Sequence, residues 1–180
     1  MSELVLRNHQ RVRRVNTALL RRLVRSLLHE LIGGEDYELC VHLVAAPEMV
    51  RLNETFLRHA GSTDVIAFDY SAAADVGRPS KMAKGSVLPY VGCHGMLHGE
   101  IFVCVDEAVR QARRFRTSWQ SELVRYVVHG VLHLRGFKDH RTAVRRKMKR
   151  EENRLLRALA RRFTLTALAG LPRVARAHKS

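Results

Sequence analysis

Residues 129–140 read HGVLHLRGFKDH, which places His129 and His133 four residues apart within an apolar run. Because an α-helix turns once in ~3.6 residues, both imidazoles project from one helical face, about one turn apart. Two imidazoles at this spacing can bind one metal ion from a rigid base. Gly136 can adopt the left-handed conformation that ends a helix, so the chain can turn and bring one member of the following Asp-His pair back as a third ligand.

The residue directly after the first histidine limits the type of reaction that such a metal site could catalyse. Metallopeptidases of the zincin class carry the same pair as H-E-x-x-H, with a general-base Glu directly after the first histidine. This chain has Gly130 at that position. The pattern therefore predicts a metal site that lacks the peptidase base. The alternative that needs no metal is a pair of histidines packed in the core.

The surrounding sequence predicts an α+β fold: a small mixed β-sheet with flanking helices and a central buried helix that carries the metal-ligand histidines. Ser118 is placed to begin that helix, and its near-continuous apolar composition indicates burial on most sides. Glycine, proline and serine without periodicity indicate a loop over residues 71–98. Alternating and helical apolar spacings predict strands at 3–7, 37–44, 64–70 and 100–105, and helices at 16–33, 47–57, 106–115, 118–136 and 142–162.

The length of 180 residues suits one domain. We expect it to span residues 1–163, followed by a basic, flexible tail at 164–180. No apolar run reaches the ~20 residues of a membrane span, and the first residues do not resemble a signal peptide. Three cysteines at irregular spacing fit neither a disulfide framework nor a zinc clip, so we expect a cytoplasmic protein.

The net charge of +15 is concentrated at the two ends of the chain. Residues 1–30 carry seven basic and two acidic side chains, residues 31–140 carry twelve and thirteen, and residues 141–180 carry thirteen and two. Basic flanks around a near-neutral, metal-bearing centre suit a polyanion such as RNA. A solvated basic surface without a specific partner is the plainer interpretation.

Three ordered motifs together resemble the YbeY family of metal-dependent endoribonucleases. The motif at 129–140 resembles the signature H-G-x-L-H-L-x-G-[FY]-D-H. Residues 63–68, TDVIAF, resemble the family strand T-D-V-[IL]-[ST]-F, and residues 99–104, GEIFVC, resemble G-[DE]-I-x-[IV]-S. The similarity covers roughly residues 35–160.

The resemblance implies that His129 and His133 are catalytic ligands of one zinc ion, with a third ligand ten residues after the first. Lys138 acts as a one-residue insertion, so Asp139 has the family spacing while His140 has the family residue type. Both side chains can bind zinc, and we favour Asp139. The family's phosphate-binding Arg has no direct counterpart here, and Arg58 is the candidate substitute.

The function implied by the resemblance is that of a single-strand-type endoribonuclease in ribosomal RNA processing, maturation and ribosome quality control. The expected partners are ribosomal RNA and ribosomal particles, with ribosomal or assembly proteins as further candidates, and neither a membrane nor a nucleotide cofactor is expected. Arg135 is a second candidate for holding the scissile phosphate. The alternatives are a zincin-like metallopeptidase, a ribosome-associated protein with a structural zinc site, and an RNA-binding protein without metal.

Overall fold

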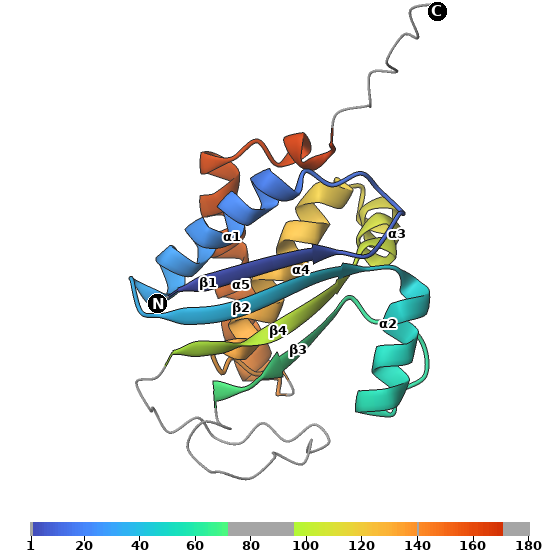
Figure 1. Cartoon of the computed structure of the whole chain (residues 1–180), viewed down its shortest axis with the longest axis horizontal. Coiled ribbons are helices and arrows are strands. Elements are labelled where there is room, and N and C mark those ends of the chain that lie inside the picture. The colour runs from blue at the N-terminus through green and yellow to red at the C-terminus, as the bar shows by residue number, and fades with distance from the viewer. Residues whose placement is uncertain (1, 72–95, 140, 171–180) are drawn as a thin grey trace, which may run out of the picture.

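The computed structural model describes residues 2–71, 96–139 and 141–170 (Figure 1). Its elements follow the predicted order with small shifts at their ends. The strands are β1 (Glu3–Asn8), β2 (Tyr37–Val44), β3 (Val65–Asp69) and β4 (Leu97–Cys104). The helices are α1 (Thr17–Ile32), α2 (Ala46–Leu52), α3 (Val105–Phe115), α4 (Trp119–Leu134) and α5 (Thr142–Arg162), with a π-helical turn η1 (Asn53–Leu57) and a 3-10 turn η3 (Leu165–Leu168).

The four strands form one mixed sheet in the order β1-β2-β4-β3. β1 and β4 both run parallel to β2, whereas β3 is antiparallel to β4. Figure 1 shows α1, α4 and α5 behind this sheet. α2 packs on the opposite face, where Met49 joins a smaller apolar cluster with Val44, Ile66 and Cys104. The predicted α+β class and the mixed sheet are confirmed.

The histidine helix α4 lies at the centre of the larger core. It packs between α3, α5, β3 and β4, and its valines and leucines are buried on most sides. Gly130 is where α4 comes closest to the sheet. A Cβ atom at this position would meet the Cγ2 atoms of Ile101 and Val65 at 3.0 Å. The glycine therefore allows a close contact between helix and sheet, which fixes how the two histidines are presented.

Local capping signals correctly placed both ends of α1 and the start of α4. The side chain of Asn16 caps α1, that of Ser118 caps α4, and Gly33 ends α1 in the left-handed conformation. Asp106 was expected to begin α3, but that helix begins at Val105. The carboxylate of Asp106 instead accepts a hydrogen bond of 2.7 Å from the backbone N–H of Ala46, at the start of α2.

The chain after α5 remains packed against the domain beyond residue 164. Leu168 is fully buried, and its carbonyl accepts a hydrogen bond from the backbone N–H of Asn16 at 2.8 Å. Val15 and Ala169 form an isolated β-bridge. The described part of the expected flexible tail is therefore docked, and the rest of that tail lies outside the described residues. Among the described helices, none is both long enough and apolar enough to cross a membrane.

Candidate metal centre and cleft

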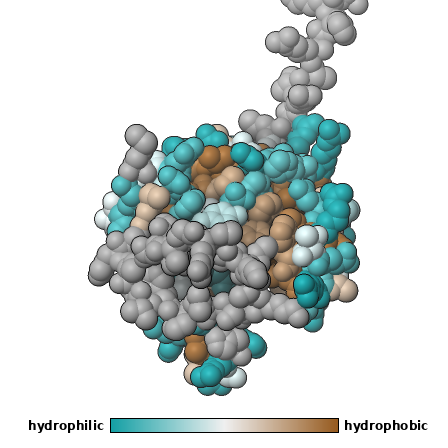
Figure 2. Space-filling view, turned by 60° about the horizontal axis from the view of Figure 1, so that its bottom comes forward, coloured by the Kyte–Doolittle hydropathy of each residue, from teal (hydrophilic) through white to brown (hydrophobic). Residues whose placement is uncertain are grey.

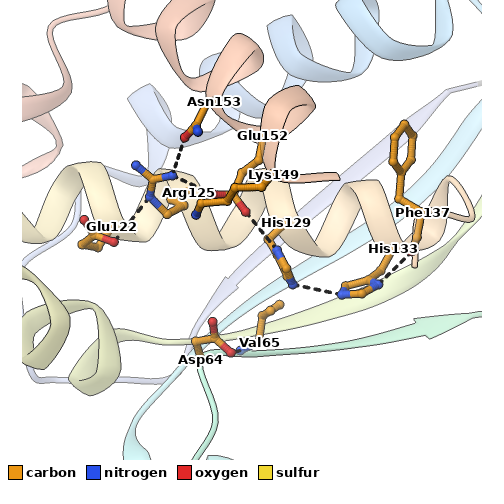
Figure 3. A network of polar contacts seen from close by, with 10 residues as sticks. All are labelled: Asp64, Val65, Glu122, Arg125, His129, His133, Phe137, Lys149, Glu152 and Asn153. Carbon is orange, nitrogen blue, oxygen red and sulfur yellow. Dashed lines mark hydrogen bonds and ion pairs between the residues drawn. The ribbon is translucent and has the colours of Figure 1, made fainter. Parts of the chain in front are cut away.

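His129 and His133 meet on one face of α4, as their spacing predicts (Figure 3). Their Nε2 atoms lie 3.0 Å apart, and the two rings are nearly perpendicular at 81°. A tetrahedral zinc ion bound through both atoms would hold them about 3.3 Å apart. The pair is therefore close to the geometry of a shared ion.

Hydrogen bonds at the other ring nitrogens decide which atoms can bind a metal. Nδ1 of His133 lies 3.1 Å from the carbonyl oxygen of Phe137, and Nδ1 of His129 lies 3.0 Å from a carboxylate oxygen of Glu152. Both oxygens can only accept, so each neutral ring carries its proton on Nδ1 and leaves a lone pair on Nε2. Two lone pairs then face each other at 3.0 Å with no proton between them. A cation would satisfy both, so the donor set fits a metal ion.

Burial supports the neutral form of the second histidine. Burial, and then the neighbouring His129, lower the pKa of His133 below its ordinary value. Neutral imidazole is the form that binds metal.

Asp139 is placed where it could supply a third donor. The turn after α4 contains Gly136 at φ 79° and closes with a bond from the Phe137 N–H to the Leu132 carbonyl, 3.0 Å long. It brings a carboxylate oxygen of Asp139 within 4.8 Å of donor atoms of both histidines. The backbone carbonyl of Asp139 is held by Nε of Arg145, at 2.9 Å. The competing candidate, His140, lies outside the described residues.

Glu152, on α5, connects the metal centre to a buried network of charges (Figure 3). Its side chain is almost fully buried, and one oxygen contacts Nη1 of Arg125 at 2.6 Å and Nζ of Lys149 at 2.7 Å while the other contacts His129. Arg125 also donates to the side-chain oxygen of Asn153, at 3.0 Å. Burial alone would raise the pKa of this carboxyl, but hydrogen bonds from His129, Lys149 and Arg125 outweigh burial and lower it to about 2. The carboxylate is therefore charged whenever the site can bind metal.

A cleft of about 640 Å³ runs along α4, between the end of α3 and α5. Its charged lining residues are Arg114, Arg125, Arg145 and Lys149, together with Asp64, Glu122, Asp139 and Glu152; His129 also lines it. Two of the carboxylates, on Glu122 and Glu152, are buried and paired. Arg114, Arg145 and Lys149 are exposed. Because Arg125 and Lys149 pair with these two carboxylates, Arg114 and Arg145 are the lining cations left without a carboxylate partner among the ion pairs of the described residues, and the cleft borders the metal centre.

The two arginines expected to hold a phosphate are not among the residues that line this cleft. Arg58 is exposed at the end of η1, in a left-handed conformation with φ 56°. Arg135 forms an ion pair with Glu35, whose Oε2 lies 3.1 Å from Nη1. The cleft cations come instead from α3, α4 and α5.

Sequence reasoning missed Glu152 and the cations around it. A signal was available, because Glu152 falls on the apolar face of α5, four residues after Met148 and three before Leu155. A carboxylate at a buried helical position needs a charged or hydrogen-bonding partner. The identity of that partner depends on how α5 packs against α4, which the local sequence does not encode.

Comparisons with known proteins show which family the chain resembles. The model of a family described as "Endoribonuclease YbeY" matches residues 5–160. A protein of that description from Chlorobium luteolum is 31% identical over 149 residues, covering 83% of this chain and 93% of its own length. One from Chlorobium phaeovibrioides is 32% identical over 142 residues, covering 79% and 81%.

A solved structure shows the same fold. The solution structure of TM1509 from Thermotoga maritima matches with a TM-score of 0.58 at 23% identity, covering 97% of this chain and all of that one.

Proposed function

The chain belongs to the YbeY family of endoribonucleases, and on this basis we propose that it is a single-strand-type, metal-dependent endoribonuclease of ribosomal RNA processing, maturation and ribosome quality control. The observation that carries the proposal is the pair of histidine Nε2 atoms 3.0 Å apart, with the Asp139 carboxylate nearby and a cleft lined by charged residues beside them. The expected substrate is ribosomal RNA, within ribosomal particles or their precursors.

We propose one zinc ion held by His129, His133 and Asp139. Imidazole nitrogen and carboxylate oxygen are normal zinc donors, and three protein ligands leave one position for water or substrate. A zinc ion held there would lower the pKa of a bound water far below that of bulk water, and it would polarise a phosphoryl oxygen. The exposed carboxylate of Asp139 and the adjoining cleft favour this open site over a closed, structural one.

In the proposed reaction, the side chains of the protein bind and orient the reacting groups. Glu152 and the Phe137 carbonyl hold the two imidazoles in the ligand tautomer. Arg145 presents an exposed cation along the cleft, where it can pair with a phosphate of the strand. Gly130 offers no base, and the space around it shows why: a side chain there would point into Ile101 and Val65 of the sheet. This observation favours the nuclease over a zincin-like peptidase.

The cellular setting is part of the proposal. Cys40 and Cys104 are free thiols in the described part of the chain, as expected in a reducing cytoplasm. Ribosomal or assembly proteins are further candidate partners.

A cleavage assay on structured ribosomal RNA tests the proposal. We expect the wild type to cleave, and His133→Ala and a chelator-treated sample to lose cleavage, with activity of the treated sample restored by zinc. His29→Ala is the matched control, because His29 is an exposed histidine at the end of α1 that does not line the cleft. Equal cleavage by wild type, His133→Ala and the chelated protein would overturn the metal-nuclease proposal.

A further inference from the structure

Phe115 is the most exposed large apolar side chain in the described residues. Its exposure is 61%, against 37% for each of Phe56, Leu57, Tyr70 and Met96. Single exposed apolar residues are ordinary on protein surfaces and need no functional explanation by themselves. Phe115 differs because it lines the same cleft as His129.

The ring is presented from a fixed position. It ends α3, where Arg116 adopts φ 55° and its backbone N–H bonds to the Ala112 carbonyl. The next residue, Thr117, donates a side-chain hydrogen bond of 2.7 Å to Glu122 of α4. This contact ties the end of α3 to the helix that carries the metal ligands. The position of the ring relative to the centre is therefore set by packed helices.

A cation accompanies the ring. The guanidinium carbon of Arg114 lies 5.4 Å from the ring centroid, within the distance of a cation–π contact. An exposed aromatic ring next to an exposed arginine combines a flat apolar surface with a charge that can pair with phosphate. Proteins bind single-stranded nucleic acid with this combination, stacking bases on the ring and holding the backbone with cations.

We propose that Phe115 and Arg114 form a nucleobase-stacking subsite for an unpaired nucleotide of the RNA. The base stacks on the ring face that Arg114 does not cover, and the guanidinium pairs with an adjacent phosphate. Glu122 and His129 are seven residues apart on α4, which is about 10 Å along the helix axis. The stacked base therefore belongs to a nucleotide displaced along the cleft from the metal centre. The subsite rests on the proposed endoribonuclease function and adds a physical reason for preferring single strands, because the stacked neighbours of a paired base already cover its faces.

The test pairs protein variants with abasic RNA. Binding of a single-stranded RNA oligonucleotide to the intact, zinc-loaded protein is measured by fluorescence anisotropy, while gels follow its cleavage. We expect Phe115→Ala to weaken binding about 5- to 150-fold, the equivalent of losing one stacked base. Phe115→Trp should keep the affinity. Phe56→Ala is the matched control, because Phe56 is also an exposed aromatic residue but does not line the cleft.

Removing one base at a time from the oligonucleotide makes the test specific. One abasic position should weaken binding by the wild type and have no further effect on Phe115→Ala. Unchanged binding by Phe115→Ala, or an equal abasic effect in both proteins, would overturn the subsite. If the wild type cleaves RNA and only these couplings are absent, the subsite fails alone. If the wild type neither binds nor cleaves RNA, the proposed function fails with it.

Discussion

At the scale of single residues, the identity of the third metal ligand determines what the centre can do. The turn that Gly136 permits brings Asp139 back toward the histidines, and the Asp139 carboxylate lies within 4.8 Å of donor atoms of both. A carboxylate ligand contributes one negative charge to the metal site, whereas a third neutral imidazole would contribute none. The assignment therefore affects how strongly a coordinated water is acidified.

Metal analysis distinguishes the two candidates. We expect Asp139→Ala to lose most of its zinc at limiting metal, because a three-ligand site is reduced to two. His140→Ala should keep its zinc, with His29→Ala as the unaffected control. Zinc per protein after dialysis is the measurement. Zinc retention by Asp139→Ala together with zinc loss by His140→Ala would reverse the assignment.

In the proposed zinc site, Glu152 acts on the metal through His129. Its carboxylate accepts the Nδ1 proton at 3.0 Å, which keeps Nε2 free for the ion. We expect Glu152→Gln to weaken zinc binding about 10- to 100-fold, the usual effect of losing a partner that orients a ligand. Competition with a chromophoric chelator measures this affinity independently of RNA cleavage.

The same substitution also removes the counter-charge of Lys149 and one of the two counter-charges of Arg125, so the unfolding free energy must be measured alongside. Glu151→Gln is the matched control, because Glu151 pairs with Arg154 away from the cleft. Unchanged zinc affinity in a folded Glu152→Gln protein would show that Glu152 serves stability alone.

At the scale of elements, the contact between α4 and the sheet explains the glycine within the histidine motif. A Cβ at residue 130 would meet Ile101 and Val65 at 3.0 Å. Overpacking of this kind costs ~1–3 kcal/mol, and the better helix propensity of alanine offsets ~1 kcal/mol. We expect Gly130→Ala to lower the unfolding free energy by ~0–2 kcal/mol.

Gly130→Glu adds a buried charge to the same clash, and we expect a loss of at least ~3 kcal/mol. Urea denaturation measures both variants, and Ala160→Glu on the exposed side of α5 is the control for adding a glutamate. A stable Gly130→Glu protein would show that a peptidase-type base could have been accommodated here, and that its absence is not steric.

Local signals predicted both ends of α1 and the start of α4 because Asn16, Gly33 and Ser118 act within one helical turn. Asp106 was misassigned because its carboxylate caps α2, 60 residues earlier in the chain. β4 begins at Leu97 rather than Glu100, since it pairs with β2 along its whole length. The residue spacing predicted the histidine pair and Asp139, whereas the role of Glu152 could be recognised only from the packing of α5 on α4. The motif alone could not predict contacts between residues that are distant in sequence.

At the scale of the whole molecule, the two basic flanks of the sequence lie side by side. α1 and α5 pack together, and Arg154 and Arg162 of α5 both pair with Glu30 of α1, at 2.9 and 3.3 Å. The charges that are remote in sequence therefore form one basic surface. Arg145 and Lys149 of α5 extend this surface to the cleft, which both residues line.

This surface predicts a steep dependence of RNA binding on salt. Each phosphate contact with a single strand contributes a slope of about −0.7 to the logarithm of affinity against the logarithm of salt concentration. Arg146 and Arg150 are exposed one turn apart on α5. We expect Arg146→Gln combined with Arg150→Gln to reduce the magnitude of the slope by about 1.4 if both contact phosphates, without changing zinc content.

The control for this pair is Arg154→Gln, since the Arg154 guanidinium is already committed to Glu30 and Glu151 and should change the slope little. Anisotropy of labelled single-stranded RNA between low and moderate salt gives the slope for each protein. An unchanged slope in the double variant, with RNA still bound, would place the RNA away from the outer face of α5 and confine its path to the cleft. The same slope loss in Arg154→Gln would show instead that the flanks act through their total charge and not through individual phosphate contacts.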